Sequence, residues 1–242
     1  MGVDGFTPEE RTYEGETKLV HRAGEGPAVV VIHEQPGITP KVAGFGRTVV
    51  DAGFTVTMPS LFGVDGRSLS LGSWLPQLAR NCVASEFAAF AVGKTAPVTR
   101  WLRALASDEH ERCGGPGVGV VGMCFTGGYG LAMAVDDTVL APVLAQPSLP
   151  LTPTRRGKAD VHLSPDDLAV VKARDDLCVL GLRYRDDPLS PGARFETLRR
   201  ELGDRFIGVE LPGRKHSTLT EHADAGAIET TLEFLRDRLL AG

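Results

Sequence analysis

Short runs of apolar and β-branched residues recur along the chain, and they show little alternation with polar residues. Such runs are typical of strands that are buried on both faces of a sheet. The runs that we interpret as strands are residues 28–33, 54–58, 118–121, 139–145, 178–182 and 206–211. A sheet with both faces covered is therefore the first expectation.

Between these runs, apolar residues return every three or four positions, which predicts helices. In the last such segment Ile228, Leu232, Leu235 and Leu239 fall on one helix face. The predicted helices are residues 39–52, 85–106, 125–135, 164–173, 190–202 and 221–240. Strand and helix thus alternate, which indicates an α/β fold whose mostly parallel central sheet carries helices on both faces.

The proline-rich stretch 146–154 interrupts this alternation and could be a linker between two domains. The same spacing of strands and helices resumes after it, however, so an ordered loop is the better interpretation. We therefore expect a single domain over residues 1–242.

Composition and charge narrow the class of protein. With 42% hydrophobic and 24% charged residues the chain resembles soluble globular proteins. The longest uncharged run, 113–135, contains eight glycines and a proline, so no membrane span is expected. The start, MGVDGFTPEE, has no basic region followed by an apolar one, which favours a cytoplasmic location. A net charge of -5 without a long Lys/Arg run argues against nucleic acid and favours a small-molecule partner.

Motifs for metals and cofactors are incomplete. The GKT sequence at 93–95 is not a phosphate loop, because Ala88 stands where that motif needs its first glycine. The HE pair at 33–34 is not a zinc-protease motif, because Gly37 stands where the second histidine would be. We expect neither a metal nor a cofactor. The cysteines form no CxxC pair and are expected to be free thiols: Cys82, Cys113, Cys124 and Cys178.

The stretch 117–128, GVGVVGMCFTGG, allows two interpretations. Gly117, Gly119 and Gly122 satisfy the G-x-G-x-x-G dinucleotide fingerprint, but that motif must follow a strand. The preceding residues 112–116, RCGGP, make a poor strand. The dinucleotide interpretation is therefore disfavoured.

The alternative makes residues 118–121 the strand and places Cys124 at the apex of a sharp strand-to-helix turn. Such a turn holds a nucleophile in a strained conformation and needs small neighbours, here Gly122, Gly127 and Gly128. The amino terminus of the following helix favours a thiolate. The competing explanation is a buried cysteine beside a glycine-rich turn.

A thiol nucleophile needs a base, and the base needs a carboxylate to orient it. Asp187 follows the strand 178–182, and His216 follows the strand 206–211, so both lie where such folds gather their active sites. Asp186 is a rival for the first role. A surface aspartate and a solvated loop histidine remain the simpler alternatives. The other histidines near predicted helix starts, His162 and His222, occupy weaker contexts.

Four motifs together resemble the dienelactone hydrolase family of α/β-hydrolases, over nearly the whole chain. They are PSLFG at 59–63, GMCFTGG at 122–128, DPLSP at 187–191 and KHS at 215–217. The resemblance implies an α/β-hydrolase fold and cleavage of a small ester or lactone, as by a carboxymethylenebutenolidase. Cys124, His216 and Asp187 would form the triad, and the acyl group would pass through a thioester.

The resemblance assigns three further roles. Glu34, at the end of an early strand, would contact the resting thiol and modulate it. The backbone N–H groups of Gln35 and Phe125 would form the oxyanion hole. The alternative on the same fold is a non-catalytic protein in which Cys124 is a redox-sensitive thiol or part of a ligand site.

The sequence also departs from the family pattern. Thr126 stands where the best-known members have glycine. Thr220 and Ser85 stand where the arginines that hold a substrate carboxylate are expected, with Arg80 and Arg214 as possible substitutes. A small ester, lactone or thioester is therefore a safer expectation than dienelactone itself.

Overall fold

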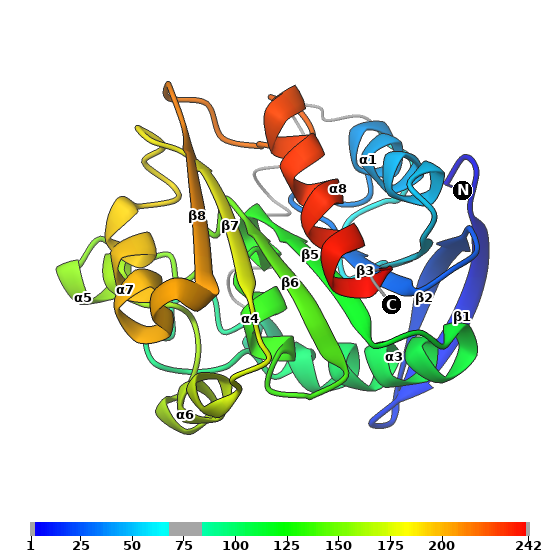
Figure 1. The fold of residues 1–242 in the computed structure, drawn as a ribbon, viewed down its shortest axis with the longest axis horizontal. Helices are drawn as coiled ribbons and strands as arrows, with labels where there is room; N and C mark the ends of the chain where they lie inside the picture. The colour runs from blue at the N-terminus through cyan, green and yellow to red at the C-terminus, as the bar shows by residue number, and fades with distance from the viewer. Residues whose placement is uncertain (1–2, 68–83, 241–242) are drawn as a thin grey trace.

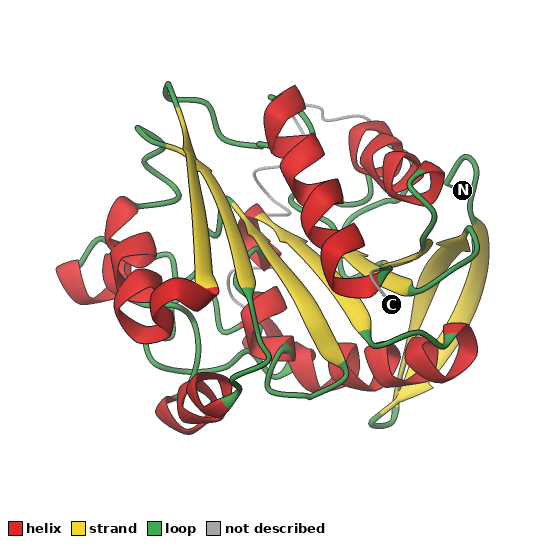
Figure 2. Ribbon diagram, viewed as in Figure 1, coloured by secondary structure: helices red, strands yellow, loops and turns green. Residues whose placement is uncertain are grey.

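The computed structural model describes residues 3–67 and 84–240, and these form one eight-stranded sheet with helices on both faces (Figures 1 and 2). The strand order is β1-β2-β4-β3-β5-β6-β7-β8. β1 pairs with β2 and β2 with β4 in antiparallel register, whereas the remaining neighbours are parallel. The strands are β1 (Thr7–Tyr13), β2 (Glu16–Ala23), β3 (Ala28–Ile32), β4 (Thr55–Pro59), β5 (Val118–Met123), β6 (Val139–Ala145), β7 (Val179–Tyr184) and β8 (Phe206–Leu211).

Helices follow the parallel strands and pack against the sheet. The described α-helices are α1 (Pro40–Asp51), α3 (Val98–Cys113), α4 (Tyr129–Met133), α5 (Arg155–Ala159), α6 (Pro165–Ala173), α7 (Gly192–Leu202) and α8 (Ala225–Leu239). Three 3-10 turns accompany them: η1 (Ser85–Phe87), η2 (Cys124–Thr126) and η3 (Gly203–Arg205). Four described helices begin where a side chain accepts a backbone N–H, which satisfies one of their free donors: Thr39 at α1, Thr154 at α5, Ser164 at α6 and Asp224 at α8.

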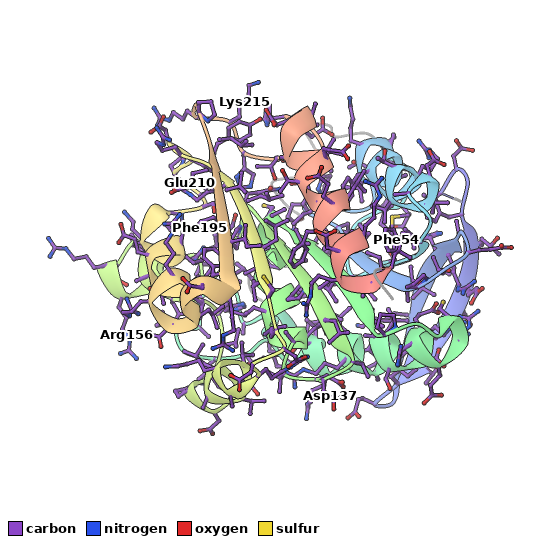
Figure 3. The ribbon with its side chains drawn as sticks, viewed as in Figure 1. Phe54, Asp137, Arg156, Phe195, Glu210 and Lys215 are labelled. Carbon is purple, nitrogen blue, oxygen red and sulfur yellow. The ribbon has the colours of Figure 1, made fainter. Side chains whose placement is uncertain are left out.

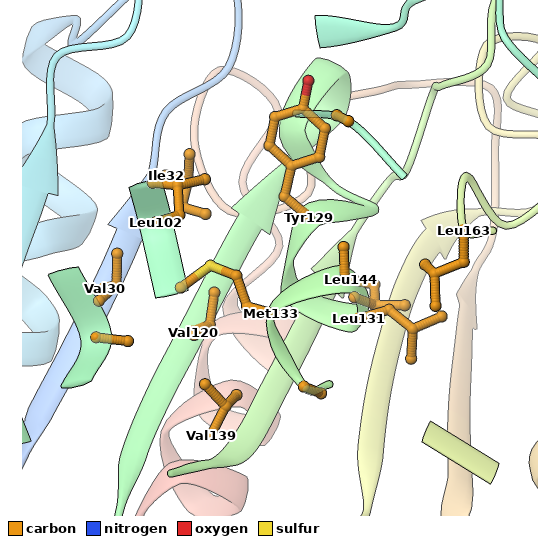
Figure 4. Close-up of a cluster of buried hydrophobic side chains, with 14 of the residues drawn as sticks. Val30, Ile32, Leu102, Val120, Tyr129, Leu131, Met133, Val139, Leu144 and Leu163 are labelled. Atoms are coloured by element: carbon orange, nitrogen blue, oxygen red, sulfur yellow. The ribbon is translucent and has the colours of Figure 1, made fainter. Parts of the chain in front are cut away.

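Each face of the sheet carries its own hydrophobic core, because side chains alternate along a strand. In β3, Val29 and Val31 pack in the core that includes α1 and α8, while Val30 and Ile32 pack in the core that includes α3 and α4. Figure 4 shows Ile32 and Val30 among the side chains of this second core. All four valine and isoleucine side chains are fully buried.

All six strands that the sequence predicted are present, with boundaries that differ by at most two residues. The hairpin of β1 and β2 was not predicted. Its residues are mostly polar and half-exposed, so the alternation of apolar and polar positions is weak. Its turn has Glu14 and Gly15 at φ 53° and 78°, the backbone that a two-residue hairpin loop requires.

The prediction of one helix over residues 85–106 was wrong. The segment contains η1 and then a turn at Gly93 with φ 65°, and α3 begins only after Pro97. Proline lacks the N–H that a helix interior needs, which explains why the helix starts there rather than passing through. The stretch 146–154 lies in an ordered loop before α5.

Three of the cysteines are free thiols: Cys113, Cys124 and Cys178. Cys82 lies outside the described residues. No helix in ranges 3–67 and 84–240 is both long and apolar enough to span a bilayer.

Candidate active site

Four loops that follow parallel strands meet at the carboxyl edge of the sheet. They follow β3, β5, β7 and β8 and carry Glu34, Cys124, Asp187 and His216. Lys215, labelled at the upper end of β8 in Figure 3, marks this edge. Because parallel strands all end at one edge, residues far apart in the sequence are brought into one cluster.

Cys124 occupies a strained turn directly after β5. Its φ is 53°, a left-handed conformation that costs a non-glycine residue energy. A Cβ on Gly122 would lie 2.4 Å from the Thr126 carbonyl oxygen, and one on Gly127 would lie 2.6 Å from Pro147 Cα. The turn therefore requires glycine at both positions. At Gly128 a Cβ would lie 3.6 Å from its nearest neighbour, so the expectation that this glycine makes room was wrong.

The turn leads into η2 rather than directly into a helix. α4 begins at Tyr129 and has five residues, so the predicted helix 125–135 is shorter than expected. A helix this short contributes little dipole at the sulfur, because fewer peptide units are aligned. Hydrogen bonds around the turn hold the backbone of Cys124, whose carbonyl oxygen accepts the N–H groups of Gly127 and Ser148.

Thr126, the departure from glycine noted in the sequence, supplies several of these bonds. Its buried hydroxyl accepts the Met123 N–H at 3.1 Å. The same hydroxyl lies 3.0 Å from the Ile32 carbonyl oxygen and 3.2 Å from that of His33, to which it donates. Thr126 thus links the turn after β5 to the end of β3, two residues before Glu34.

His216 and Asp187 meet in the geometry expected of a base and its orienting carboxylate. Asp187 is 3% exposed, and its Oδ2 lies 2.6 Å from His216 Nδ1. Its Oδ1 accepts the Leu189 N–H at 2.9 Å, which fixes the carboxylate. Asp186 is exposed and points to no such partner. The structure therefore places Asp187, and not its neighbour, beside the imidazole.

The charge state of His216 is set by its neighbours. Burial alone would lower its pKa, but the negative charge of Cys124 and the hydrogen bond with Asp187 outweigh burial and raise the pKa from 6.5 to about 11. Within the described residues Nε2 makes no hydrogen bond. A ring nitrogen of His216, Cys124 Sγ and a Glu34 carboxylate oxygen all lie within 4.8 Å of one another. The imidazole of His216 is thus favoured in its protonated form at neutral pH.

Glu34 is buried, and hydroxyl and amide donors surround it. Its Oε2 accepts from Ser217 Oγ at 2.8 Å and from Gln146 Nε2 at 3.4 Å, and its Oε1 accepts from Thr220 Oγ1. Burial raises the pKa of Glu34, and these donors together with the charge of His216 counteract part of the rise. The carboxylate therefore lies beside the thiol, as the resemblance implies, but neutral donors hold it.

Two polar residues of the proline-rich loop, Gln146 and Ser148, were not among the candidates drawn from the sequence. Gln146 has φ 35° and accepts from both the backbone and the hydroxyl of Thr218, at 3.1 Å and 2.6 Å. Ser148 donates its N–H to the Cys124 carbonyl at 2.9 Å, and its Oγ lies 3.7 Å from Cys124 Sγ. No sequence motif marks either residue, because their roles depend on a loop conformation.

The two positions expected to supply an oxyanion hole follow directly after Glu34 and Cys124 in the sequence. Gln35 and Phe125 both line the cavity that contains Cys124 Sγ. Neither N–H takes part in the backbone hydrogen bonds of the described loops and turns. Both donors are thus available, and their role remains a prediction.

The cavity above Cys124 has a volume of about 500 Å³. Leu151, Leu189 and Pro36 supply apolar walls, and Phe125 packs edge to face against Phe62 and Phe87. Glu221, His222, Glu34, Gln35, Cys124, Ser148, His216 and Ser217 complete the lining. No lysine or arginine of the described residues lines this cavity.

The possible substitutes for the missing arginines do not fill that role in the described residues. Arg214 is exposed and does not line the cavity. Arg80 lies outside the described residues. Ser85 is exposed at the start of η1, and Thr220 donates to Glu34. The position that the family pattern gives to a substrate-binding arginine therefore serves a different purpose here.

The two other histidines considered in the sequence, His162 and His222, do not take the place of His216 beside Asp187. His162 is buried, stacks on Tyr129, and its Nε2 lies 2.9 Å from the Ala88 carbonyl oxygen. His222 is exposed at the cavity wall. Neither forms a hydrogen bond with Asp187. Glu34, Cys124 and His216 are also spaced closely enough to ligate a metal ion, and such an ion would occupy the thiolate and block it.

Comparisons with known proteins identify the family and the fold of this chain. The model of the dienelactone hydrolase family matches residues 16–176. No curated protein matches the sequence. A Klebsiella pneumoniae protein assigned as a dienelactone hydrolase is 15% identical, with a TM-score of 0.66 over 99% of this chain and 100% of that one.

Two further solved structures have the same fold. A dienelactone hydrolase-like promiscuous phosphotriesterase from metagenomic libraries is 19% identical, with a TM-score of 0.67 over 97% of this chain and 98% of that one. A cold-adapted esterase from an Arctic intertidal metagenomic library is 16% identical, with a TM-score of 0.64 over 96% of this chain and 93% of that one. The fold is therefore that of an α/β-hydrolase, and the chain belongs to the dienelactone hydrolase family.

Proposed function

We propose that this hydrolase cleaves a small carboxylic ester or lactone through a thioester on Cys124. Membership of the dienelactone hydrolase family supports hydrolysis of an ester bond. The single observation that carries the proposal is the 2.6 Å contact of His216 with Asp187, on a ring that lies within 4.8 Å of Cys124 Sγ. A solvated histidine or a merely structural cysteine needs no such arrangement.

In the first half of the reaction, the thiolate of Cys124 attacks the carbonyl carbon of the ester. A C–S bond forms, and the negative charge moves to the carbonyl oxygen, where the N–H groups of Gln35 and Phe125 stabilise it. Each such donor contributes roughly 3 kcal/mol in comparable sites. When the C–O bond breaks, His216 gives its proton to the leaving alkoxide, and an acyl thioester remains.

In the second half, water attacks the thioester carbonyl. His216, now neutral, takes a proton from the water, and Asp187 keeps the imidazole in the orientation and tautomer that this step requires. The C–S bond breaks, the acid leaves, and thiolate and imidazolium are restored. No step uses a metal or a cofactor. For a lactone, the alcohol and the acid leave as one molecule.

The experiment is a substrate panel. Purified protein is mixed with p-nitrophenyl esters of short acyl chains and with five- and six-membered lactones, and product release is followed with and without prior alkylation by iodoacetamide. We expect turnover of at least one ester or lactone and its loss after alkylation. The proposal is wrong if the whole panel is inert, or if alkylated protein remains fully active.

A further inference from the structure

A second cavity adjoins the one above Cys124. It has a volume of about 280 Å³ and shares Ser148, Leu151 and Leu189 with the first. Ser148 Oγ is 3.7 Å from Cys124 Sγ, so the boundary between the two cavities lies next to the reacting atom. A substrate bound with its carbonyl at Cys124 can therefore extend into the second cavity.

The second cavity differs from the first in its charge. Among the described residues, no cation lines the first cavity, whereas Lys158 and Arg194 both line the second. Prolines form much of the remaining wall, which makes it rigid. A rigid cavity with cationic side chains is suited to hold an anionic group in a fixed place.

Arg194 is a buried cation without an acidic side chain bound to it. It is 2% exposed, and its guanidinium donates to four backbone carbonyl oxygens: Asp160 at 2.6 Å, Pro147 at 2.5 Å, Gly157 at 3.2 Å and Pro150 at 3.5 Å. The carboxylate of Asp160 is occupied elsewhere, because it accepts the N–H groups of Gly93 and His162. Burial lowers the pKa of Arg194 to about 10, and Asp160 only partly offsets this. Backbone carbonyl oxygens therefore surround the positive charge, and no carboxylate of the described residues forms an ion pair with it.

Lys158 adds a second positive charge at the exposed side of the cavity. It lies on α5, where Arg155 and Arg156 are also exposed, and none of the three forms an ion pair with a described residue. Figure 3 shows Arg156 at the edge of the molecule. Among the described residues, the lining of this cavity thus contains two cations and no acidic residue, in a protein whose net charge is -5.

From this geometry we infer that the second cavity binds the anionic end of the substrate. This inference rests on the proposed function, the hydrolysis of an ester at Cys124. The substrate is an ester whose acyl part ends in a carboxylate. Its reacting carbonyl lies at Cys124, and its carboxylate lies between Lys158 and Arg194. Lys158 is then a specificity-determining residue, and Arg194 holds the charge in place from below.

The test compares matched esters that differ in charge. The p-nitrophenyl monoesters of succinic, glutaric and adipic acid are compared with p-nitrophenyl esters of neutral acids of equal chain length. Wild type is expected to have the higher kcat/KM for at least one anionic ester. Lys158→Gln should lower the anionic-to-neutral ratio about fivefold, and Lys158→Arg should keep it. Added salt should lower the ratio in wild type, because it screens the attraction.

Lys41→Gln is the matched control. Lys41 is exposed on α1, which lies on the other side of the molecule from α5 (Figure 1), so this change removes the same charge far from the cavity. The anionic-to-neutral ratio of kcat/KM in Lys41→Gln should equal that of wild type. An equal ratio in wild type, Lys158→Gln and Lys41→Gln would overturn the inference while leaving ester hydrolysis intact.

A second measurement does not depend on turnover. Alkylation of Cys124 by iodoacetamide is followed in the presence of glutarate or of its neutral diamide. Glutarate should slow alkylation in wild type and in Lys41→Gln but not in Lys158→Gln, and the diamide should have no effect. This outcome would support the anion site even if every ester proved inert. The absence of protection by glutarate, together with equal ester ratios, would refute it.

Discussion

Thr220 donates a hydrogen bond from its hydroxyl to the buried carboxylate of Glu34. The sequence placed Thr220 at a position where members of the family that cleave dienelactone use arginine to hold substrate. Here the residue instead joins Ser217 and Gln146 in donating to a buried carboxylate beside the thiol, and these bonds oppose the rise in pKa that burial causes. A position that usually serves substrate binding thus serves the charge balance of the site.

Removing this hydrogen bond should destabilise the fold in a pH-dependent way. Burial already raises the pKa of Glu34, and Thr220→Val removes a donor that opposes the rise. We expect a loss of about 1–3 kcal/mol in the free energy of unfolding at pH 7. The loss should shrink as pH falls and Glu34 takes up its proton. Urea unfolding of both proteins between pH 5 and pH 7 measures this.

The control for that experiment is Thr197→Val. Thr197 is also buried, and its hydroxyl donates to the Ala193 carbonyl at 3.1 Å without an ionisable partner. Its loss of stability should not depend on pH. A pH-independent loss in Thr220→Val as well would contradict the assignment.

Asp187 and Asp186 form a natural pair of variants. Asp187→Asn keeps the size of the side chain and the acceptor for Leu189 but removes the charge beside His216. We expect kcat to fall on the order of 10²–10⁴-fold. Asp186→Asn, at an exposed position, should remain near wild type. The measurement is kcat of wild type and of both variants with one ester. Similar losses of kcat in both variants would exclude a specific role for Asp187.

The pKa of His216 should depend on the thiolate. In Cys124→Ala the negative charge that helps to raise this pKa to about 11 is absent, so the pKa should fall towards its ordinary value of 6.5. Since the folded pKa is the higher one, the imidazolium stabilises wild type fully below about pH 6.5, and this contribution is lost as pH rises towards 11. NMR titration of the imidazole gives both values. An unchanged pKa would show that Cys124 does not carry the charge.

Ser148 should favour the reactive form of the thiol. Its hydroxyl lies 3.7 Å from Cys124 Sγ and 3.2 Å from the Gln146 carbonyl oxygen, and it shares one hydrogen between these acceptors. Ser148→Ala removes this donor, which stabilises negative charge on sulfur. We expect slower alkylation by iodoacetamide at pH 7 and a lower kcat with little change in KM. Ser190→Ala is the matched control, because Ser190 is buried and its hydroxyl has no hydrogen-bond partner in the described residues. Equal rates in both variants would count against this role.

Some of these features can be predicted from sequence because they depend on local residue types. Buried parallel strands are continuous apolar runs, which is why all six were found, and glycines around Cys124 mark the strained turn. Asp187 and His216 could be proposed because they follow strands that end at one edge of the sheet. The choice between Asp186 and Asp187 needed burial, which only the packed structure supplies.

Other features arise from long-range packing and have no local signal. The β1–β2 hairpin is polar and covers one edge of the sheet through backbone pairing, which constrains side chains weakly. Ser148 and Gln146 act through a loop whose conformation depends on the whole fold. The buried charge of Arg194 is held by carbonyl oxygens from four separate residues, so no motif could reveal it.

The central claim is that Cys124 carries the acyl group, and intact-protein and peptide mass spectrometry after rapid acid quenching tests it most directly. Wild type mixed with a p-nitrophenyl ester that it hydrolyses should gain the mass of one acyl group on the peptide that contains Cys124. Cys124→Ala should fold and show neither the adduct nor turnover. Full turnover in Cys124→Ala, or an acyl group trapped on another residue, would contradict the mechanism.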